Sequence, residues 1–160
     1  MNRNVGWRFS SLMSTGVAMT AAVAHLMELP AKMRYEPPLY VRLHRTLYWN
    51  FGRAAGPAES LAVAITGALA WRERQRGSRG APWITVAAAS LAAAHAIFWS
   101  VVQPVNTEMV RWPLEVIPQD WRRWRDRWEY GHAVRAGLIT AAFAALTIGV
   151  LNETPDAAHS

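Results

Sequence analysis

Four apolar segments constrain the fold of this chain more than any other feature. They cover roughly residues 9–29, 56–71, 81–102 and 133–151. A helix that crosses a bilayer needs about 20 predominantly apolar residues, and the third segment contains no formally charged residue at all. A helix of a soluble bundle would show a polar outer face, which the third segment lacks. We therefore predict an all-α, integral-membrane four-helix bundle.

The composition of the segments predicts how they pack. All four are rich in Ala, Gly, Ser and Thr, which let membrane helices approach closely. The second is short, so we expect it to include 50–55, with the Arg53 side chain reaching back to the interface. Four crossings place both termini at one end of the bundle. We predict one domain over 1–151, followed by a disordered polar tail over 152–160.

Two long connections, 30–55 and 103–131, then lie at the end opposite the termini. The first contains an amphipathic candidate helix over 40–50 that begins after Pro37-Pro38 and places His44 at the interfacial surface. In the second, prolines make the first half irregular, and a Trp- and Arg-rich helix begins near 118–120 and leads into the last span. A signal peptide is an alternative for the first segment, but its apolar run continues past the small-residue site at 22–24.

A stripe of aromatic and titratable side chains marks the entry to the last span. Alternating steps of four and three residues place five side chains on a single helix face: Trp121, Arg125, Trp128, His132 and Arg135. A helix lying on lipid headgroups is the alternative interpretation. Because His132 and Arg135 continue the face into the bundle, the pattern favours a site.

Other ionisable residues gather in the same half of the bundle. Such residues are costly in a membrane unless paired, and they are functional candidates by default. We expect one cavity that opens toward the long connections, where His25, Glu28, His95, Asn106 and His132 converge. Within it, Arg135 is expected to face Glu28, Glu59 or an anionic ligand.

Composition excludes several classes of protein. The chain has no Cys, which excludes disulfides, zinc–thiolate sites and Cys nucleophiles, and hydrolase motifs are missing. The formal charge of +6 comes mostly from Arg that flanks apolar segments, so we expect a lipid bilayer as partner and no nucleic acid. A metal ion held by His25, Glu28, His95 and His132 remains an alternative to a site without a metal, although the full di-iron pattern is absent.

These motifs, in their order and spacing, resemble one known family. The residues that carry the likeness are Pro104-Val105-Asn106, Trp112, Trp121, Arg125, Trp128, His132 and Arg135, preceded by His25 to Pro30, Tyr40, His44, Tyr48 and Gly52. Together they resemble the anthrone-oxygenase-like family of small four-helix membrane proteins, over roughly 15–151. Many members of that family have no known function.

The resemblance implies a reaction. Characterised relatives oxidise polycyclic phenolic anthrones to quinones without a conventional flavin or haem. The chain would then be a membrane-bound oxidoreductase, a cofactor-poor monooxygenase, acting on a small lipophilic aromatic or phenolic molecule. The resemblance places Asn106, Trp112, Trp128, His132 and Arg135 at the signature positions of the family. The His25–Glu28 pair departs from the more weakly patterned first helix of the anthrone enzymes and leaves room for a different chemistry.

Roles for the individual residues follow from their chemistry. His132 or His25 would be the general base, Asn106 is a further catalytic candidate, and Arg135 with Arg125 would stabilise the anion. Substrate contacts would come from Trp112, Trp121, Trp128, Arg125 and Glu28.

Other functions and properties are also compatible with the sequence. The alternative to an enzyme is a non-catalytic membrane subunit that binds lipid, quinone or haem in the same pocket; a transporter fits less well, because the chain has no repeat. A multi-pass location in a bacterial-type inner membrane and a homo-oligomer are further expectations.

Overall fold

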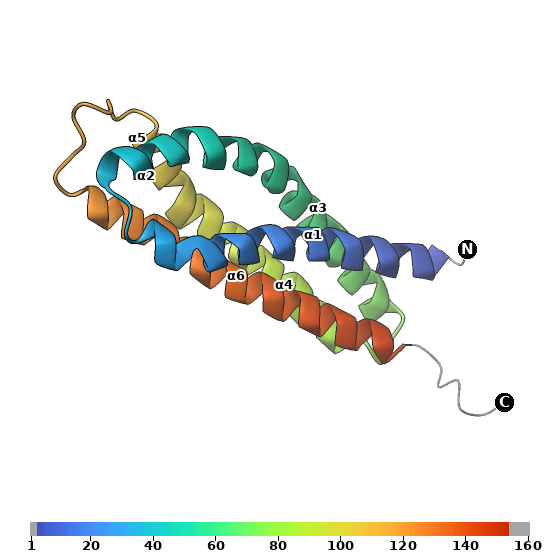
Figure 1. The fold of residues 1–160 in the computed structure, drawn as a ribbon. Coiled ribbons are helices and arrows are strands. Elements are labelled where there is room, and N and C mark those ends of the chain that lie inside the picture. The colour runs from blue at the N-terminus through green and yellow to red at the C-terminus, as the bar shows by residue number, and fades with distance from the viewer. Residues whose placement is uncertain (1–2, 154–160) are drawn as a thin grey trace.

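A computed structural model describes residues 3–153 of the chain, and this part contains helices and no strand. Four long helices form the bundle: α1 (Arg3–Lys32), α3 (Trp49–Gln75), α4 (Ala81–Ile97) and α6 (Trp121–Leu151) (Figure 1). There are also two short helices, each next to a π-helical segment. Helix α2 (Pro37–Leu43) is followed by η1 (His44–Tyr48), and η2 (Phe98–Val102) is followed by α5 (Gln103–Met109). The prediction of an all-α four-helix bundle is confirmed.

Both ends of the described chain lie at one end of the bundle, beside the short α3–α4 connection, as predicted (Figure 1). Helices α2 and α5 and the irregular segment before α6 lie at the other end. Of the predicted polar tail, residues 154–160 lie outside the described residues. Glu153, at its start, accepts a hydrogen bond from the Gly80 backbone N–H at 2.6 Å and pairs with Arg8 at 3.3 Å.

The helix that carries the second apolar segment is longer than predicted. The helical run begins at Pro37, before the expected start at residue 40, and residues 40–50 do not form a separate interfacial helix. Helix α2, η1 and α3 follow one another without a break over 37–75. In this run, His44 of the π-helical segment η1 is buried rather than at the surface, and Tyr48 is partly buried.

A proline explains the second π-helical segment. Pro104 has no N–H to donate to the carbonyl of Ser100, one turn before it. That carbonyl accepts a hydrogen bond from Arg127 Nη2 of α6 at 3.1 Å instead. Segment η2 ends at Val102, and α5 begins at Gln103 with Pro104 in its first turn and Asn106 at its midpoint.

Three helical runs are long and apolar enough to cross a membrane, as is typical of a membrane protein: Val5–Lys32, Ala81–Met109 and Trp121–Leu151. Helix α3 is not among them. It has sufficient length, but charged residues at both ends lower its hydropathy, among them Arg53 and Arg72. A fourth crossing by α3 therefore stays a prediction.

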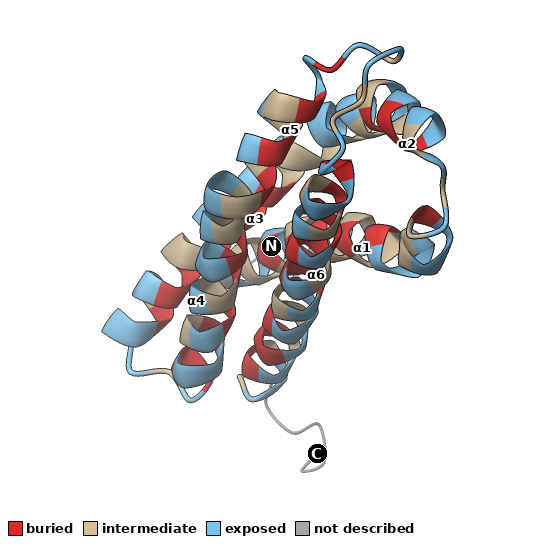
Figure 2. Ribbon diagram, turned by 90° about the vertical axis from the view of Figure 1, so that its left-hand side faces the viewer, coloured by how far each residue is buried: buried red, intermediate tan, exposed pale blue. Residues whose placement is uncertain are grey.

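Small residues hold the core of the bundle together near the termini. The buried faces of the four long helices meet there (Figure 2), and the buried residues are mainly Ala with Leu69, Ile84 and Leu146. Gly80, which caps the start of α4, lies tightly against Gly149 of α6, since a Cβ built on Gly80 would lie 2.1 Å from the Gly149 carbonyl oxygen. Only residues without a side chain permit this contact.

Candidate functional site

A second hydrophobic cluster closes the end of the bundle opposite the termini. It contains Tyr40, Val41, Val102, Val105, Met109, Trp112, Trp121 and Trp128. Trp112 donates its Nε1–H to Glu108 at 3.1 Å, and Arg125 donates to the Met33 carbonyl at 3.0 Å. Trp112, Trp121 and Arg125, which we predicted to contact substrate, lie in or beside this cluster and line neither of the two cavities described next.

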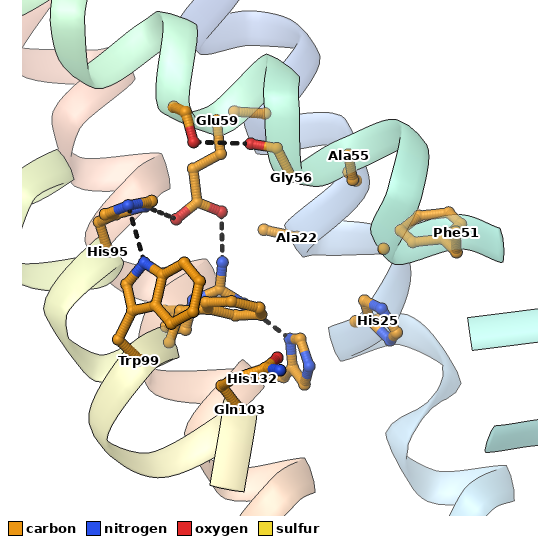
Figure 3. Close-up of a pocket in the computed structure, with 16 residues that line it drawn as sticks. Ala22, His25, Phe51, Ala55, Gly56, Glu59, His95, Trp99, Gln103 and His132 are labelled. Carbon is orange, nitrogen blue, oxygen red and sulfur yellow. Dashed lines mark hydrogen bonds and ion pairs between the residues drawn. The ribbon is translucent and has the colours of Figure 1, made fainter. Parts of the chain in front are cut away.

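Two adjoining cavities lie between this cluster and the small-residue core. The first, of about 270 Å³, is lined mainly by α1, α3, α4 and α6 and has Glu59 and His95 in its wall (Figure 3), together with Arg135. The second, of about 180 Å³, lies closer to α2 and α5 and has His44 and Asn106 in its wall. The two share His25, Gly52, Phe98, Gln103 and His132. The rest of the first wall is largely Ala, Gly, Phe and Trp, whereas the second wall also contains Tyr48, Arg45 and Arg53.

Two imidazoles form the partition between the cavities. The rings of His25 and His132 are stacked, with centroids 4.4 Å apart and planes inclined by 23°. Trp128 meets both of them edge-on, with centroids 5.2 Å from His25 and 4.3 Å from His132. The convergence predicted for His25, His95 and His132 is confirmed, since all three line the first cavity.

The other two residues of the predicted convergence lie elsewhere. Asn106 lines the second cavity only. The Glu28 side chain is 46% exposed, accepts a hydrogen bond from the Tyr48 hydroxyl at 2.9 Å and lines neither cavity. The single cavity that we expected is therefore a pair of cavities, and Glu28 stands outside both.

Each of the stacked imidazoles meets a cation at its Nδ1 atom. Arg135 Nη1 lies 2.9 Å from His132 Nδ1, and Lys32 Nζ lies 3.4 Å from His25 Nδ1. A guanidinium and an ammonium only donate hydrogen bonds, so each Nδ1 is the acceptor. Neutral His25 and His132 therefore carry their proton on Nε2.

Arg135 pairs with Glu59 of α3, which confirms one of the partners predicted for it. Its Nε also donates to the Ala94 carbonyl at 3.2 Å, so three helices meet at this guanidinium. The other Glu59 oxygen lies 3.4 Å from His95 Nδ1, and Trp99 donates its Nε1–H to His95 Nε2 at 3.0 Å (Figure 3). Because Trp99 can only donate, His95 carries its proton on Nδ1, directed at Glu59.

A buried ion pair next to the cavities was missed by the sequence analysis. Lys32 and Glu129, each 1% exposed, pair at 2.8 Å, and the Tyr40 hydroxyl donates to Glu129 at 2.9 Å. Burial, together with the Glu129 carboxylate, raises the pKa of Tyr40 far above its ordinary value. The sequence held a signal for this pair, because Glu129 lies one turn from both Arg125 and His132 on the predicted helix.

His44, which we expected at the interfacial surface, is buried and only 5% exposed. Its Nε2 lies 3.1 Å from Asn106 Oδ1, which also accepts the Trp128 Nε1–H at 2.7 Å. The amide nitrogen of Asn106 donates to Gln103 at 3.1 Å. Burial lowers the pKa of His44 to about 4, against the opposing effect of its hydrogen bond with Asn106. Asn106, a predicted catalytic residue, is thus the centre of a fixed hydrogen-bond network.

The candidate metal ligands do not form one donor set. Within residues 3–153, no group of three or more His, Asp or Glu side chains is arranged to hold a metal ion. His25 and His132 face each other ring to ring, His95 turns to Glu59, and Glu28 lies outside the cavities. The donor set of His25, Glu28, His95 and His132 therefore does not fit a metal ion.

The fold and the site together define a class: a small helical protein of membrane type, with an aromatic-lined internal cavity bordered by imidazoles and a buried Arg–Glu pair. A comparison with known families then gives the particular one. The family model for anthrone oxygenase matches residues 46–145, and the chain belongs to this family. The matched region contains Asn106, Trp112, Trp128, His132 and Arg135. No curated protein and no solved structure matches the chain.

Proposed function

We propose that this protein is a multi-pass membrane oxygenase that converts a lipophilic, phenolic polycyclic compound to a quinone with molecular oxygen. Family membership supports the class of reaction. The observation that carries the proposal is the pair of adjoining cavities, which combines apolar walls with a concentrated set of proton donors and acceptors.

The cavities suit a flat apolar ligand. Taken together they fall within the range of roughly 300–1,000 Å³ typical of small-molecule sites. Phe51 and Phe98 supply aromatic walls, and Ala18 and Ala22 supply flat ones. Because the helices around the cavities are apolar outside as well, a lipophilic substrate dissolved in the bilayer has a short route to the site.

The chemistry requires a base and an anion-stabilising wall. In an anthrone, removal of a proton from the ring CH₂ group, activated by the conjugated ketone, leaves an enolate. Reaction of that carbon with O₂ converts CH₂ to C=O and releases one water, so that CH₂ + O₂ gives C=O + H₂O. His25 and His132, with their Nε2–H groups, and Arg135 are the donors available to stabilise the anion.

Of the other residues predicted to contact the substrate or its anion, some line the cavities and others do not. Trp128 borders the second cavity and supplies a ring against which a substrate can stack. Arg125 donates to the Met33 carbonyl and pairs with Asp126, so anion stabilisation falls to Arg135. For the remaining predicted substrate contacts, Trp112, Trp121 and Glu28, the cavities offer no support.

We also propose that the three apolar runs and α3 all cross a bacterial-type inner membrane, so that the protein is multi-pass with α3 as its fourth crossing. The 27 residues of α3 span about 40 Å as a helix, more than a bilayer core needs. The charge that lowers its hydropathy is partly compensated, because Glu59 pairs with Arg135 and Glu73 with Arg8.

Turnover of anthrone by purified protein tests the proposal. Protein in lipid nanodiscs is mixed with anthrone in air-saturated buffer, and anthraquinone formation and O₂ uptake are followed together. We expect one O₂ consumed per quinone formed, well above the autoxidation seen with empty nanodiscs and with heat-inactivated protein. Binding of anthrone without turnover would favour the non-catalytic subunit instead, and a haem spectrum in the purified sample would name its ligand.

A further inference from the structure

We propose that His44 is the general base of this site and that His25 and His132 are the hydrogen-bond donors that hold the developing anion. This assignment rests on the proposed oxygenase function. It reverses the roles expected from the sequence, which gave the base to His132 or His25. The hydrogen bonds around the three imidazoles carry the argument.

His132 and His25, the bases predicted from the sequence, have no free lone pair on a ring nitrogen. His132 Nδ1 accepts from Arg135 at 2.9 Å, and His25 Nδ1 lies 3.4 Å from Lys32 Nζ. The remaining nitrogen of each ring carries the proton. To accept a proton at Nδ1, either imidazole would have to give up its contact with a buried cation and become a second positive charge beside it, which is unfavourable away from water. Both rings are therefore suited to donate a hydrogen bond to an oxygen and unsuited to remove a proton.

The hydrogen bonds at Asn106 fix the tautomer of His44. The indole N–H of Trp128 can only donate, so the Asn106 atom that it meets at 2.7 Å is the amide oxygen. His44 Nε2 lies 3.1 Å from the same oxygen and must carry the proton. The lone pair of His44 is therefore on Nδ1. This atom is buried and has no hydrogen-bond partner among the residues that the structure describes.

The residue that carries this unpartnered atom lies beside a cavity. A buried acceptor without a partner costs about 1–3 kcal/mol, so proteins retain one mainly where it serves a function. His44 lines the second cavity together with His25, Trp128 and His132. It is in a π-helical turn, a feature that is often found at functional sites. Its ring contacts Trp128 edge-on, with centroids 5.3 Å apart, so Trp128 and Asn106 together hold it in place.

The charge balance of the step is consistent with the surroundings. His44 is unprotonated at neutral pH, because burial lowers its pKa to about 4. When Nδ1 takes the proton, the C–H or O–H bond of the substrate breaks and its electron pair stays on the substrate as an enolate or phenolate. The imidazolium keeps its Nε2–H bond to Asn106, and the new anion lies between it and the Nε2–H donors of His25 and His132. Molecular oxygen is the oxidant that then consumes the anion.

His44→Gln separates the base from its support. The glutamine Nε2 can still donate to Asn106, but the basic nitrogen is gone. With anthrone as probe, we expect kcat to fall by about 10²–10⁴-fold, while KM changes little and the unfolding temperature stays close to wild type. The pH profile should also change, because wild-type kcat falls at acidic pH as the base protonates, and the residual rate of the variant should rise with hydroxide concentration.

His132→Gln is the matched comparison in the same wall. It replaces the imidazole donor with an amide of different shape and leaves the base, so we expect a smaller loss of kcat and an acidic limb like that of wild type. Two results would overturn the assignment of His44 and leave the oxygenase function standing. One is an equal loss of kcat in both variants with the acidic limb retained in His44→Gln, and the other is a fully active His44→Gln protein.

A readout without turnover separates the two proposals. In protein labelled with ¹⁵N-histidine, the His44 signals are assigned by their loss in His44→Gln. We expect the Nε2–H tautomer at neutral pH and a shift of the Nδ1 signal when 1,8-dihydroxyanthraquinone, which is not oxidised further, is added. An Nδ1–H tautomer, or an Nδ1 signal that does not respond to this ligand, overturns the inference even if wild-type protein oxidises anthrone. If the spectra are as expected but the protein does not oxidise anthrone, only the oxygenase function is refuted.

Discussion

The two ends of the bundle solve the problem of packing helices in opposite ways. At the closed end, near the termini, Ala and Gly bring the helices together, with Gly80 against Gly149 and a hydrogen bond of 2.7 Å between Ser11 and Thr66. At the site end, large aromatic and charged side chains hold the same helices apart around two cavities. The comparison shows that close contacts between small residues hold the closed end together, whereas buried ion pairs and hydrogen bonds hold the site end around its cavities.

Charge at the site end is compensated in pairs. Lys32 pairs with Glu129 and Arg135 with Glu59, all four being buried, and one imidazole contacts each cation. The cavities are thus bordered by strong hydrogen-bonding groups without a net charge from these pairs. Such a wall suits an uncharged lipophilic ligand that becomes an anion only during the reaction.

Removing one member of a buried ion pair at the site end should have the largest effect on the free energy of unfolding. Arg135→Ala leaves Glu59 buried without its ion-pair partner, and we expect the free energy of unfolding to fall by about 3–5 kcal/mol. Arg135→Lys should recover only part of this loss, because one ammonium cannot reach Glu59, Ala94 and His132 together. Denaturation in detergent measures both variants.

The double variant Arg135→Met, Glu59→Gln is the control, since it removes the whole pair and leaves no buried charge. It should be more stable than Arg135→Ala. If Arg135→Ala unfolds at the wild-type temperature, the site end does not depend on charge pairing, and the distinction between the two ends fails.

Stability should depend on pH through His44. The unfolded imidazole titrates near 6.5, and the folded one near 4. Between these values the unfolded chain binds more protons, so the contribution of His44 is complete above about pH 6.5 and is lost as the pH falls toward 4. We expect a loss of up to about 3 kcal/mol over this window. Comparing unfolding of wild type and His44→Gln at several pH values isolates this contribution, and parallel curves for the two proteins would contradict it.

Much of the fold follows from the sequence, because apolar length and helical spacing are local properties. The 81–102 segment without charge predicts its helix directly, and the stripe from Trp128 to Arg135 faces inward as its spacing predicts. The Arg135–Glu59 pair was predictable for a physical reason: a guanidinium at that depth requires a partner, and the chain offers few carboxylates.

The other parts of the site depend on tertiary contacts that spacing does not contain. Lys32 has a carboxylate one turn away, Glu28, at 3.8 Å, but its closer partner is Glu129 from another helix, at 2.8 Å. Trp121 and Arg125 share the helix face of His132, yet a rise of 1.5 Å per residue carries Trp121 about 16 Å beyond it, past the cavities. His44 is buried because a π-helical turn and Asn106 hold it inside, which no sequence pattern of this chain indicated.

A methyl group at the closed end should have an intermediate effect. A Cβ on Gly149 would lie 2.6 Å from Ile84 Cγ1 and 3.1 Å from the Gly80 carbonyl oxygen. For Gly149→Ala we expect a loss of about 1–3 kcal/mol as α4 and α6 are pushed apart. Gly137→Ala in the same helix is the matched control, because nothing lies within 4 Å of its Cβ and alanine favours the helix. If Gly149→Ala also weakens anthrone binding, the two ends are coupled rather than separate.

The smallest effect is expected for Glu28, which tests where the site ends. Its side chain is 46% exposed, and glutamine can still accept the hydrogen bond from Tyr48, so Glu28→Gln should change the free energy of unfolding by less than about 1 kcal/mol. Lys32→Gln should cost more, since it leaves the buried Glu129 without its cation. The KM for anthrone decides the functional question. Glu28 lines neither cavity, so its substitution should change KM less than His25→Gln does. An equal rise in KM for the two variants would extend the site to the surface beside Tyr48 and restore the substrate contact that the sequence predicted.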